Sequence, residues 1–317
     1  MNIREQITQR IIEAMLSGPP PWRAGWTASG MSVNAITGRA YRGINQLLLM
    51  QGQADPRWMT YKQAKKAGFQ VRKGEKSTKI VRMVEVETKK DNSGPESEVL
   101  VEEKGRRLVM RLFDVFNAEQ IDGIPPIPVR EHSIDSSDAA EAIVEGLKKT
   151  GLKIHHGGAM ACYSRNTDTI NMPHKADFHS TEDFWSTMLH ECAHSTAGAH
   201  RLCRDMGSPG SAERAREELR AEIASAMLCA EIGTPMGQHH VESHAAYVLS
   251  WVGVLKNDVN AIFEAAAAAQ GICDYLNANA LKLESTPTQE EVSEPTSQFA
   301  PAMNVAHSPT PRTRFGI

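Results

Sequence analysis

The sequence predicts an α+β protein in which a small basic α/β region precedes a mainly helical region with a short sheet. Short β-branched runs and brief helical patterns alternate over about the first 120 residues, whereas long helical patterns dominate after residue 138. The charge follows the same division. Residues 1–83 carry 14 Lys and Arg against four acids, a net charge of +10, so the rest of the chain carries −13 of the total of −3.

The basic region is expected to begin with a helix over residues 3–16, because Ile7, Ile11 and Met15 recur at helical spacing. Gly18 and the prolines that follow it end this helix. Further along, the pattern predicts an apolar helix at 46–51, a capped helix at 58–68, two strands around a glycine turn at 71–81, a polar hairpin loop at 84–107 and a buried strand at 108–117.

Composition excludes a membrane protein and favours a cytoplasmic one. No apolar stretch approaches the roughly 20 residues that a membrane-spanning helix needs. The first residues, from Met1 to Gln6, lack the apolar core of a signal peptide. The five cysteines are scattered without metal-type spacing, which is typical of reduced thiols in the cytoplasm.

The most informative motif is His190-Glu191-Cys192-Ala193-His194, on a predicted helix that Ser180 or Thr181 caps. Residues four apart share a helix face, so His190 and His194 can present both imidazoles to one metal ion. Glu191 lies beside them, where its carboxylate can act as a general base on water activated by the metal. The alternative is a pair of ordinary surface or core histidines.

A second predicted helix, over 213–229, supplies acids. Ser211 is its N-cap, and Gly233 followed by Pro235 ends it. Glu218 and Glu222 share one face, and a buried acid pair requires a cation or hydrogen-bond donors. Glu218 is therefore the expected third metal ligand, and Glu222 is expected to hydrogen-bond a ligand imidazole. The alternative is a solvated acidic face paired with neighbouring arginines.

Aromatic side chains alternate with cations in the basic region, a pattern that suits single-stranded nucleic acid. Bases can stack on the rings while Lys and Arg contact phosphates. The alternative is that Trp22, Trp26 and Trp58 are core residues of a small domain. The expected binding residues are Trp22, Arg23, Trp26, Arg39, Tyr41, Arg42, Asn45, Tyr61, Lys62, Arg72, Lys73 and Lys76.

These residues lie in segments that resemble the N-terminal single-stranded-DNA-binding domain of ArdC-type antirestriction proteins, a domain that TraC-type plasmid primases share. The matching segments are 21–26, 34–45, 60–64, 71–76 and 115–120. The second half resembles the zincin-like metallopeptidase domain of the same family, in segments 163–173, 190–194, 200–202 and 217–222. In related zincins the third ligand is the acid that opens a Glu-x-x-x-acid helix, which favours Glu218 over Glu222.

The resemblance implies a domain organisation. We expect a single-stranded-DNA-binding domain at 1–122, a linker at 123–137, a zincin-like metallopeptidase domain at 138–283 and a disordered tail at 284–317. In the second domain, 163–172 would be a strand beside the metal, able to pair with an extended peptide. Two alanine-rich helices, at 242–255 and 257–276, would close the domain.

The implied function is protection of incoming mobile DNA from host restriction by a cytoplasmic protein that carries one Zn²⁺ per chain; other divalent metals suit the same ligands. The expected partners are single-stranded DNA and a peptide or protein substrate, and no membrane. A zinc peptidase site is one interpretation. The alternative is a non-enzymatic single-stranded-DNA-binding protein whose metal site is structural or vestigial.

Overall fold

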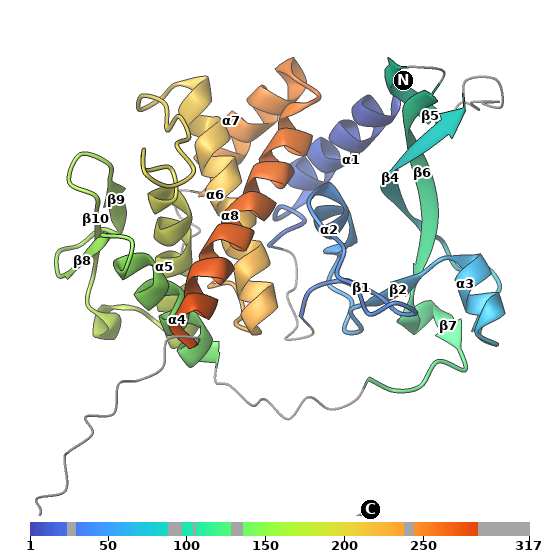
Figure 1. Cartoon of the computed structure of the whole chain (residues 1–317), viewed down its shortest axis with the longest axis horizontal. Coiled ribbons are helices and arrows are strands. Elements are labelled where there is room, and N and C mark those ends of the chain that lie inside the picture. Colours follow the sequence, from blue (N-terminus) through green and yellow to red (C-terminus); the bar gives the residue numbers. More distant parts are fainter. Residues whose placement is uncertain (24–29, 88–96, 104–105, 128–135, 238–243, 285–317) are drawn as a thin grey trace, which may run out of the picture. The chain divides into compact units, whose positions relative to one another are not determined.

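Helices and a mixed sheet form the first part of the chain, and a helical bundle with a small sheet forms the second. The computed structural model describes residues 1–23, 30–87, 97–103, 106–127, 136–237 and 244–284 (Figure 1). The α+β class predicted from the sequence is confirmed.

The first helix, α1 (Ile3–Ser17), begins at a capping box. The Oδ1 atom of Asn2 accepts a hydrogen bond from the Glu5 amide at 2.8 Å, and the Glu5 carboxylate accepts one from the Asn2 amide at 2.8 Å. Ile3, Ile7 and Ile11 are buried at helical spacing. This face packs on α7 of the second part, so the predicted helix is confirmed and its apolar stripe has a partner.

The basic region is built around a five-stranded sheet. Its strands follow the order β1-β2-β6-β4, with β5 also paired to β6. Their bounds are β1 (Val33–Asn34), β2 (Arg57–Met59), β4 (Thr78–Glu87), β5 (Ser97–Glu103) and β6 (Arg106–Asn117). The remaining elements are α2 (Ile44–Leu49), α3 (Tyr61–Lys66), the 3-10 helix η2 (Ala118–Gln120) and the strand pair β3 (Gln70–Val71) and β7 (Ile121–Asp122).

Two sequence predictions in this region were wrong. Trp58 lies in β2 rather than in a helix, because Thr60 and Gln63 form a capping box that starts α3 at Tyr61. Residues 84–107 are not mainly loop, since β4 pairs with β6 without interruption from Thr78↔Val115 to Glu87↔Arg106. Polar residues that alternate along a strand fit its solvent face, and this period-2 pattern is what the loop prediction missed.

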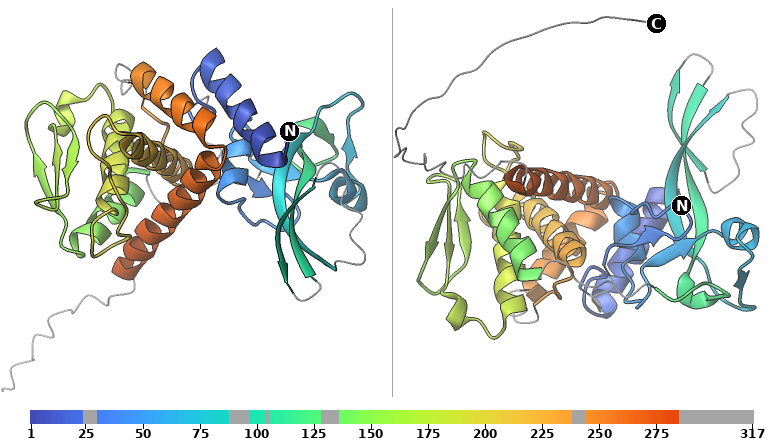
Figure 2. Two further views of the ribbon diagram at one scale, coloured as in Figure 1. Left: turned by 90° about the horizontal axis from the view of Figure 1, so that it is seen from above. Right: turned by 60° about the horizontal axis from the view of Figure 1, so that its bottom comes forward.

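Among the described residues, the second part contains a three-stranded sheet and several helices (Figures 1 and 2). Their bounds are α4 (Ser136–Lys148), β8 (Lys153–His156), β9 (Cys162–Ser164), β10 (Thr169–Met172), the 3-10 helix η3 (Lys175–Asp177), α5 (Thr181–Ser195), α6 (Ala212–Ile232), α7 (His244–Asn257) and α8 (Ala261–Glu284). Strand β10 lies between β8, to which it is parallel, and β9, to which it is antiparallel.

The single strand predicted over 163–172 is instead two strands, β9 and β10. The turn between them places Asp168 at φ 49°, in the left-handed region, which Asp tolerates better than most residues because its short side chain bonds locally. The turn makes β9 an edge strand of the sheet. It lies against helix α5, which carries the predicted metal ligands His190 and His194.

Helix α6 is the centre of the bundle, packed against both α5 and α8 (Figure 2). Helix α8 also crosses α4 at Gly146, where an added Cβ atom would lie 2.8 Å from the backbone C and O atoms of Asn279. A glycine is therefore required for this close approach. Helix α6 ends at Gly233 in the left-handed conformation, as its sequence predicts.

One hydrophobic cluster includes side chains from α1, α5, α6, α7 and α8. Thr8 in α1 also donates a hydrogen bond to the Val259 carbonyl at 2.8 Å. By its internal contacts, Met1–Ser285 is one compact unit. The predicted domain boundaries therefore stay a prediction. Glu284, the first residue of the proposed tail, ends α8, and the rest of the tail and most of the proposed linker lie outside the described residues. None of the described helices is long and apolar enough to span a membrane.

Candidate metal centre

Helix α5 presents the two histidines of the sequence motif on one face. Its N-terminus is fixed by Ser180, whose hydroxyl accepts a hydrogen bond from the Asp183 amide at 3.0 Å. Met188 and Leu189 are buried and orient the helix. As a result, the Nε2 atoms of His190 and His194 face each other at 3.1 Å.

Glu218 of α6 completes a group of three. One carboxylate oxygen lies 3.5 Å from His190 Nε2, and the other lies 3.5 Å from His194 Nε2. One ligand atom from each residue falls within 4.8 Å of the others, and no second such group occurs among the described residues. Two imidazole nitrogens and one carboxylate oxygen converging in this way fit a tetrahedral divalent metal with one position open.

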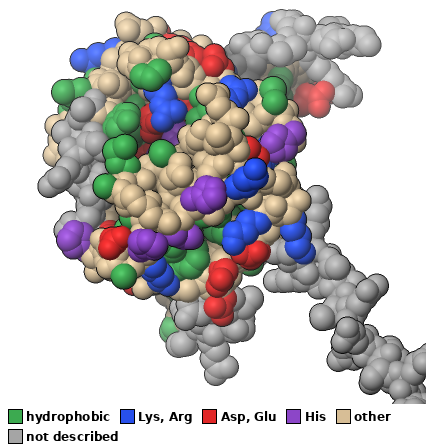
Figure 3. Space-filling model, turned by 90° about the vertical axis from the view of Figure 1, so that its left-hand side faces the viewer, with side chains coloured by type: hydrophobic (Ala, Val, Ile, Leu, Met, Phe, Trp, Pro, Cys, Tyr) green, Lys and Arg blue, Asp and Glu red, His purple; other side chains and the backbone are tan. Residues whose placement is uncertain are grey.

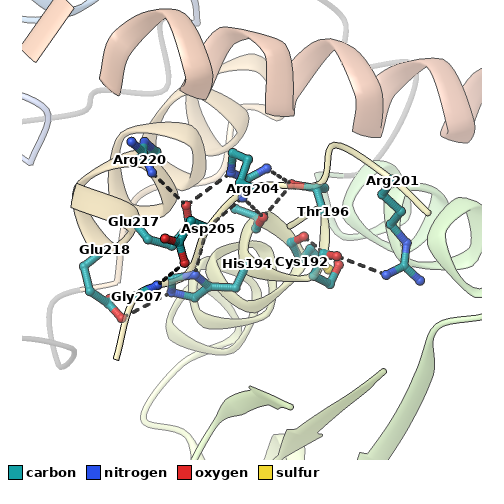
Figure 4. Close-up of polar contacts among 12 residues, drawn as sticks. Cys192, His194, Thr196, Arg201, Arg204, Asp205, Gly207, Glu217, Glu218 and Arg220 are labelled. Carbon is teal, nitrogen blue, oxygen red and sulfur yellow. Dashed lines mark hydrogen bonds and ion pairs between the residues drawn. The ribbon is translucent and has the colours of Figure 1, made fainter. Parts of the chain in front are cut away.

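The outer nitrogens of both histidines face carboxylates. His190 Nδ1 lies 3.6 Å from Glu222, as the sequence predicts. His194 Nδ1 lies 3.4 Å from Glu217, which the sequence analysis did not single out. Glu217 is fully buried and accepts hydrogen bonds from Arg204 at 2.8 and 3.2 Å (Figure 4). Such partners fix the orientation of ligand imidazoles.

A signal for Glu217 was present in the sequence, since it adjoins Glu218 at the start of the same acid-rich turn. Its role depends on Arg204, which comes from the loop before α6 and also donates to the Ala193 carbonyl at 3.0 Å. That contact joins the loop to α5, and it could not be predicted from a local sequence pattern.

The electrostatic field at this site favours a cation. Burial alone would lower the pKa of His190, but hydrogen bonds to Glu218 and Glu222 outweigh burial and raise it to about 10. Burial would raise the pKa of both carboxyls, yet the histidines hold the pKa of Glu218 and Glu222 well below the usual range. The ionised acids that favour a proton on His190 would equally favour a metal ion.

The ligand atoms open into a cleft of about 210 Å³. His190, Glu191, His194, Glu218 and Glu222 line one side, and the remaining walls are formed by Arg23, Ala161, Cys162, Tyr163, Met206, Arg214, Tyr247 and Trp251. Glu191 is only 6% exposed, and Arg214 forms an ion pair with Glu218. Cys192 is fully buried, as expected of a core filler.

A separate network places β9 beside the cleft. The side chain of Arg201 is fully buried and donates to both carboxylate oxygens of Asp168, at 2.7 and 2.8 Å. It also donates to the Ser195 carbonyl at the end of α5, at 3.0 Å. The Tyr163 hydroxyl donates to Asp168 at 2.9 Å, and burial raises the pKa of Tyr163 to about 12. The β9–β10 turn is thus joined to α5, the helix of the two histidines.

Several other histidines lie on the face of the molecule that carries β8, β9 and β10 (Figure 3). His155, His156 and His174 are among the exposed ones. Within the described part of the chain none of them joins a group of metal-ligating side chains. Their chemistry is therefore distinct from that of His190 and His194.

Four of the residues expected to contact DNA make contacts within the protein. Burial of Trp22 contradicts its expected stacking on a base, whereas DNA contacts of Arg23, Tyr41 and Asn45 stay a prediction. Trp22 is fully buried against Trp251, with ring centroids 6.0 Å apart, so it cannot stack on a base. Arg23 is ion-paired with Glu222 at the metal centre. Asn45 is hydrogen-bonded through both amide atoms to the backbone of Val81, at 2.7 Å each.

Tyr41, the fourth, is half-buried against the cluster around Trp58. Among the rest, Arg42 is ion-paired with Asp274, and Arg72 is paired with both Glu75 and Asp122. Exposed side chains lie at Arg39, Arg42, Tyr61, Lys62, Arg72, Lys73 and Lys76. Trp26 lies outside the described residues. The exposed part of the predicted aromatic and basic surface thus lies on α3 and on the segments 39–42 and 72–76.

Two family models match the chain. Residues 1–116 match the N-terminal domain of the anti-restriction factor ArdC, and residues 138–268 match a zincin-like metallopeptidase domain. The DNA primase TraC of Escherichia coli is 41% identical over 309 residues, which cover 92% of this chain but 28% of the primase. A second E. coli primase TraC is matched over 20% of its length. The chain thus spans about a quarter of these relatives.

Other relatives are matched over nearly their whole length. The uncharacterized protein y4eC of Sinorhizobium fredii is 36% identical over 87% of this chain and 92% of its own. The metal-free crystal structure of the antirestriction protein ArdC from plasmid R388 is 35% identical, with a TM-score of 0.70, and covers 89% of this chain and 99% of that protein. A second structure of ArdC, bound to Mn(II), is 34% identical, with a TM-score of 0.70 over 88% and 98% of the two chains.

Fold and site together define an α+β protein with a zincin-like region behind a basic one. The likeness to ArdC extends over both regions at a substantial identity. The chain belongs to the ArdC family of antirestriction proteins.

Proposed function

We propose that this protein binds a divalent metal, zinc in the first instance, at His190, His194 and Glu218, and that the site is a peptidase-type hydrolytic centre. The observation that carries the proposal is the convergence of these three side chains with Glu191 in one cleft. The zincin-like family match and the Mn(II)-bound ArdC structure support a divalent metal.

The chain's own residues have separable roles in hydrolysis. A divalent metal held by the three ligands would polarise a peptide carbonyl and acidify water. Glu191, beside the ligands, accepts the proton from water and returns it to the leaving amine. Edge strand β9 offers backbone groups to an extended peptide. Glu217 and Glu222 keep the imidazoles in the required orientation.

We further propose that the basic region binds single-stranded DNA, and that the protein protects incoming DNA from restriction in the cytoplasm of a bacterial host. The exposed cations on α3 and the following turn, together with the exposed Tyr61, support this part of the proposal. Membership of the ArdC family supports the antirestriction role.

Substitution of Glu191 separates the two activities. Glu191→Gln keeps the shape of the side chain but removes the general base, so hydrolysis of a peptide substrate should fall by at least about 100-fold. Metal content and single-strand affinity should be unchanged. If Glu191→Gln retained full peptidase activity, the proposed role of Glu191 would be wrong.

A second candidate function is single-stranded-DNA binding alone, with the metal site structural or vestigial. The buried network of Glu217, Arg204 and Thr196 favours it, because it joins α5, α6 and their connecting loop, as a structural metal site would. Transfer of unmodified DNA into a restricting host decides between the two. Protection undiminished by Glu191→Gln would support the binding function, and loss of protection would support the peptidase.

A further inference from the structure

Arg23, a residue of the basic region, reaches the metal centre of the other region. Its Nε atom donates to Glu222, and the two side chains are 10% and 5% exposed. The other carboxylate oxygen of Glu222 lies 3.6 Å from Nδ1 of His190. A continuous chain of polar contacts therefore runs from Arg23 through Glu222 to a metal ligand.

Arg23 is held in place by its own segment. Trp22 is fully buried and packs against Trp251 of α7. The Arg23 amide donates to the Pro20 carbonyl at 2.7 Å, which closes a turn after consecutive prolines. The guanidinium lines the metal cleft as well as a small adjoining cavity of about 10 Å³ formed with Ser186 and Ser225. Its position is thus fixed by contacts within the protein.

We propose that Arg23 is a positioning residue for the metal centre. It holds Glu222 so that Glu222 fixes the His190 ring, whose Nε2 atom then faces the metal position. The residues that match the metallopeptidase family model, 138–268, would therefore not form the complete centre by themselves. This inference rests on the proposed metal site and adds to it a requirement for the N-terminal region.

The charges of the pair define the kind of effect to expect. The positive charge of Arg23 and the negative charge of Glu222 cancel, so the pair adds little net field at the metal. Its contribution is orientation, and loss of an outer hydrogen bond to a ligand histidine typically weakens metal binding about 10–100-fold. A buried ion pair that served only folding would change thermal stability and leave metal affinity unchanged.

The experiment measures Zn²⁺ affinity of the full-length protein by competition with a chromogenic chelator. Arg23→Ala should bind Zn²⁺ about 10–100-fold more weakly, and Arg23→Lys, which keeps a donor and the charge, should recover part of the loss. Arg57→Ala is the matched control, since Arg57 of β2 forms a comparably buried pair with Asp55, outside the cleft. The absorption spectrum of the Co²⁺-loaded protein should change with Arg23→Ala and not with Arg57→Ala.

A double-mutant cycle supplies a test that does not depend on one variant. If Arg23 acts through Glu222, then Arg23→Ala combined with Glu222→Gln should cost no more affinity than Glu222→Gln alone. Additive losses, or wild-type affinity in both Arg23→Ala and Arg23→Lys, would overturn the proposal. Failure of the wild-type protein to bind Zn²⁺ or Mn²⁺ would instead overturn the proposed metal site, so the two failures are distinguishable.

Discussion

The metal centre and the basic surface hold their charged side chains in opposite ways. At the centre, each ring nitrogen of His190 and His194 lies within 3.6 Å of another polar side chain, and the outer carboxylates are themselves held by Arg23 and Arg204. On the basic surface, Lys62, Lys73 and Lys76 are exposed on α3 and the turn after β3.

This difference separates two ways of carrying function. A pre-organised centre depends on geometry, so the loss of one side chain should remove its function. A basic surface depends on total charge, so its function should decline in steps. Substitutions in each region test this difference.

The largest effect is expected from loss of a metal ligand. His194→Ala removes one of three protein ligands, so metal affinity should fall by more than the ~100-fold upper range for loss of an outer hydrogen bond. Elemental analysis of the dialysed protein should show bound metal near one equivalent in the wild type and near zero in the variant. His155→Ala, an exposed histidine of β8, is the control. Equal metal content in all three proteins would contradict the assigned centre.

An intermediate effect is expected in the scaffold that holds β9. Asp168→Asn leaves the buried Arg201 guanidinium without its carboxylate, which should lower the free energy of unfolding by about 2–3 kcal/mol at pH 7. Burial would raise the pKa of Asp168, but Arg201 and Tyr163 outweigh it and lower the pKa below its usual value.

The lowered pKa fixes the sign of the pH dependence. The contribution of Asp168 is fully present above its unfolded-state pKa of about 4 and is lost as the pH falls through the lower folded value. Chemical denaturation of wild type and Asp168→Asn should therefore give a difference that is constant from pH 5 to 8 and shrinks below about pH 4. A difference that grew in acid would contradict the assignment.

The smallest effect is expected on the basic surface. Lys73→Ala with Lys76→Ala removes two exposed cations, so the slope of log affinity for single strands against log salt should become less steep by about 1.4. Fluorescence titrations at several salt concentrations measure this slope. Lys148→Ala with Lys149→Ala removes the same charge from the end of α4 and is the control. An unchanged slope in the Lys73 and Lys76 variant would move the DNA surface elsewhere.

Local signals in the sequence were sufficient for the helices that carry the centre. Capping and stop residues predicted α6 almost to its ends, from Ser211 to Gly233, and i, i+4 spacing brought the two histidines together. These features depend only on neighbours along the chain, which is why they could be predicted without a structure.

Contacts between distant segments were not predictable in this way. A tryptophan and an arginine beside prolines are as compatible with DNA binding as with a place in the core. In the structure, Trp22 packs on α7 and Arg23 is paired with Glu222 of α6. The prediction of one strand over 163–172 missed the turn at Asp168. Arg201, more than 30 residues away, stabilises this turn. The sequence contained the residues of these contacts but not their pairing.

The packing of α1 on α7 has a consequence for heat denaturation. Since one hydrophobic cluster includes side chains from both family-matched regions, the calorimetric and van't Hoff enthalpies of unfolding should coincide in a single transition. Metal bound in the cleft would raise the free energy of unfolding of the whole unit. The increase is about 2.7 kcal/mol when the free metal concentration is 100 times the dissociation constant. The melting temperature of the basic region would therefore rise with metal concentration, although none of the proposed ligands belongs to that region.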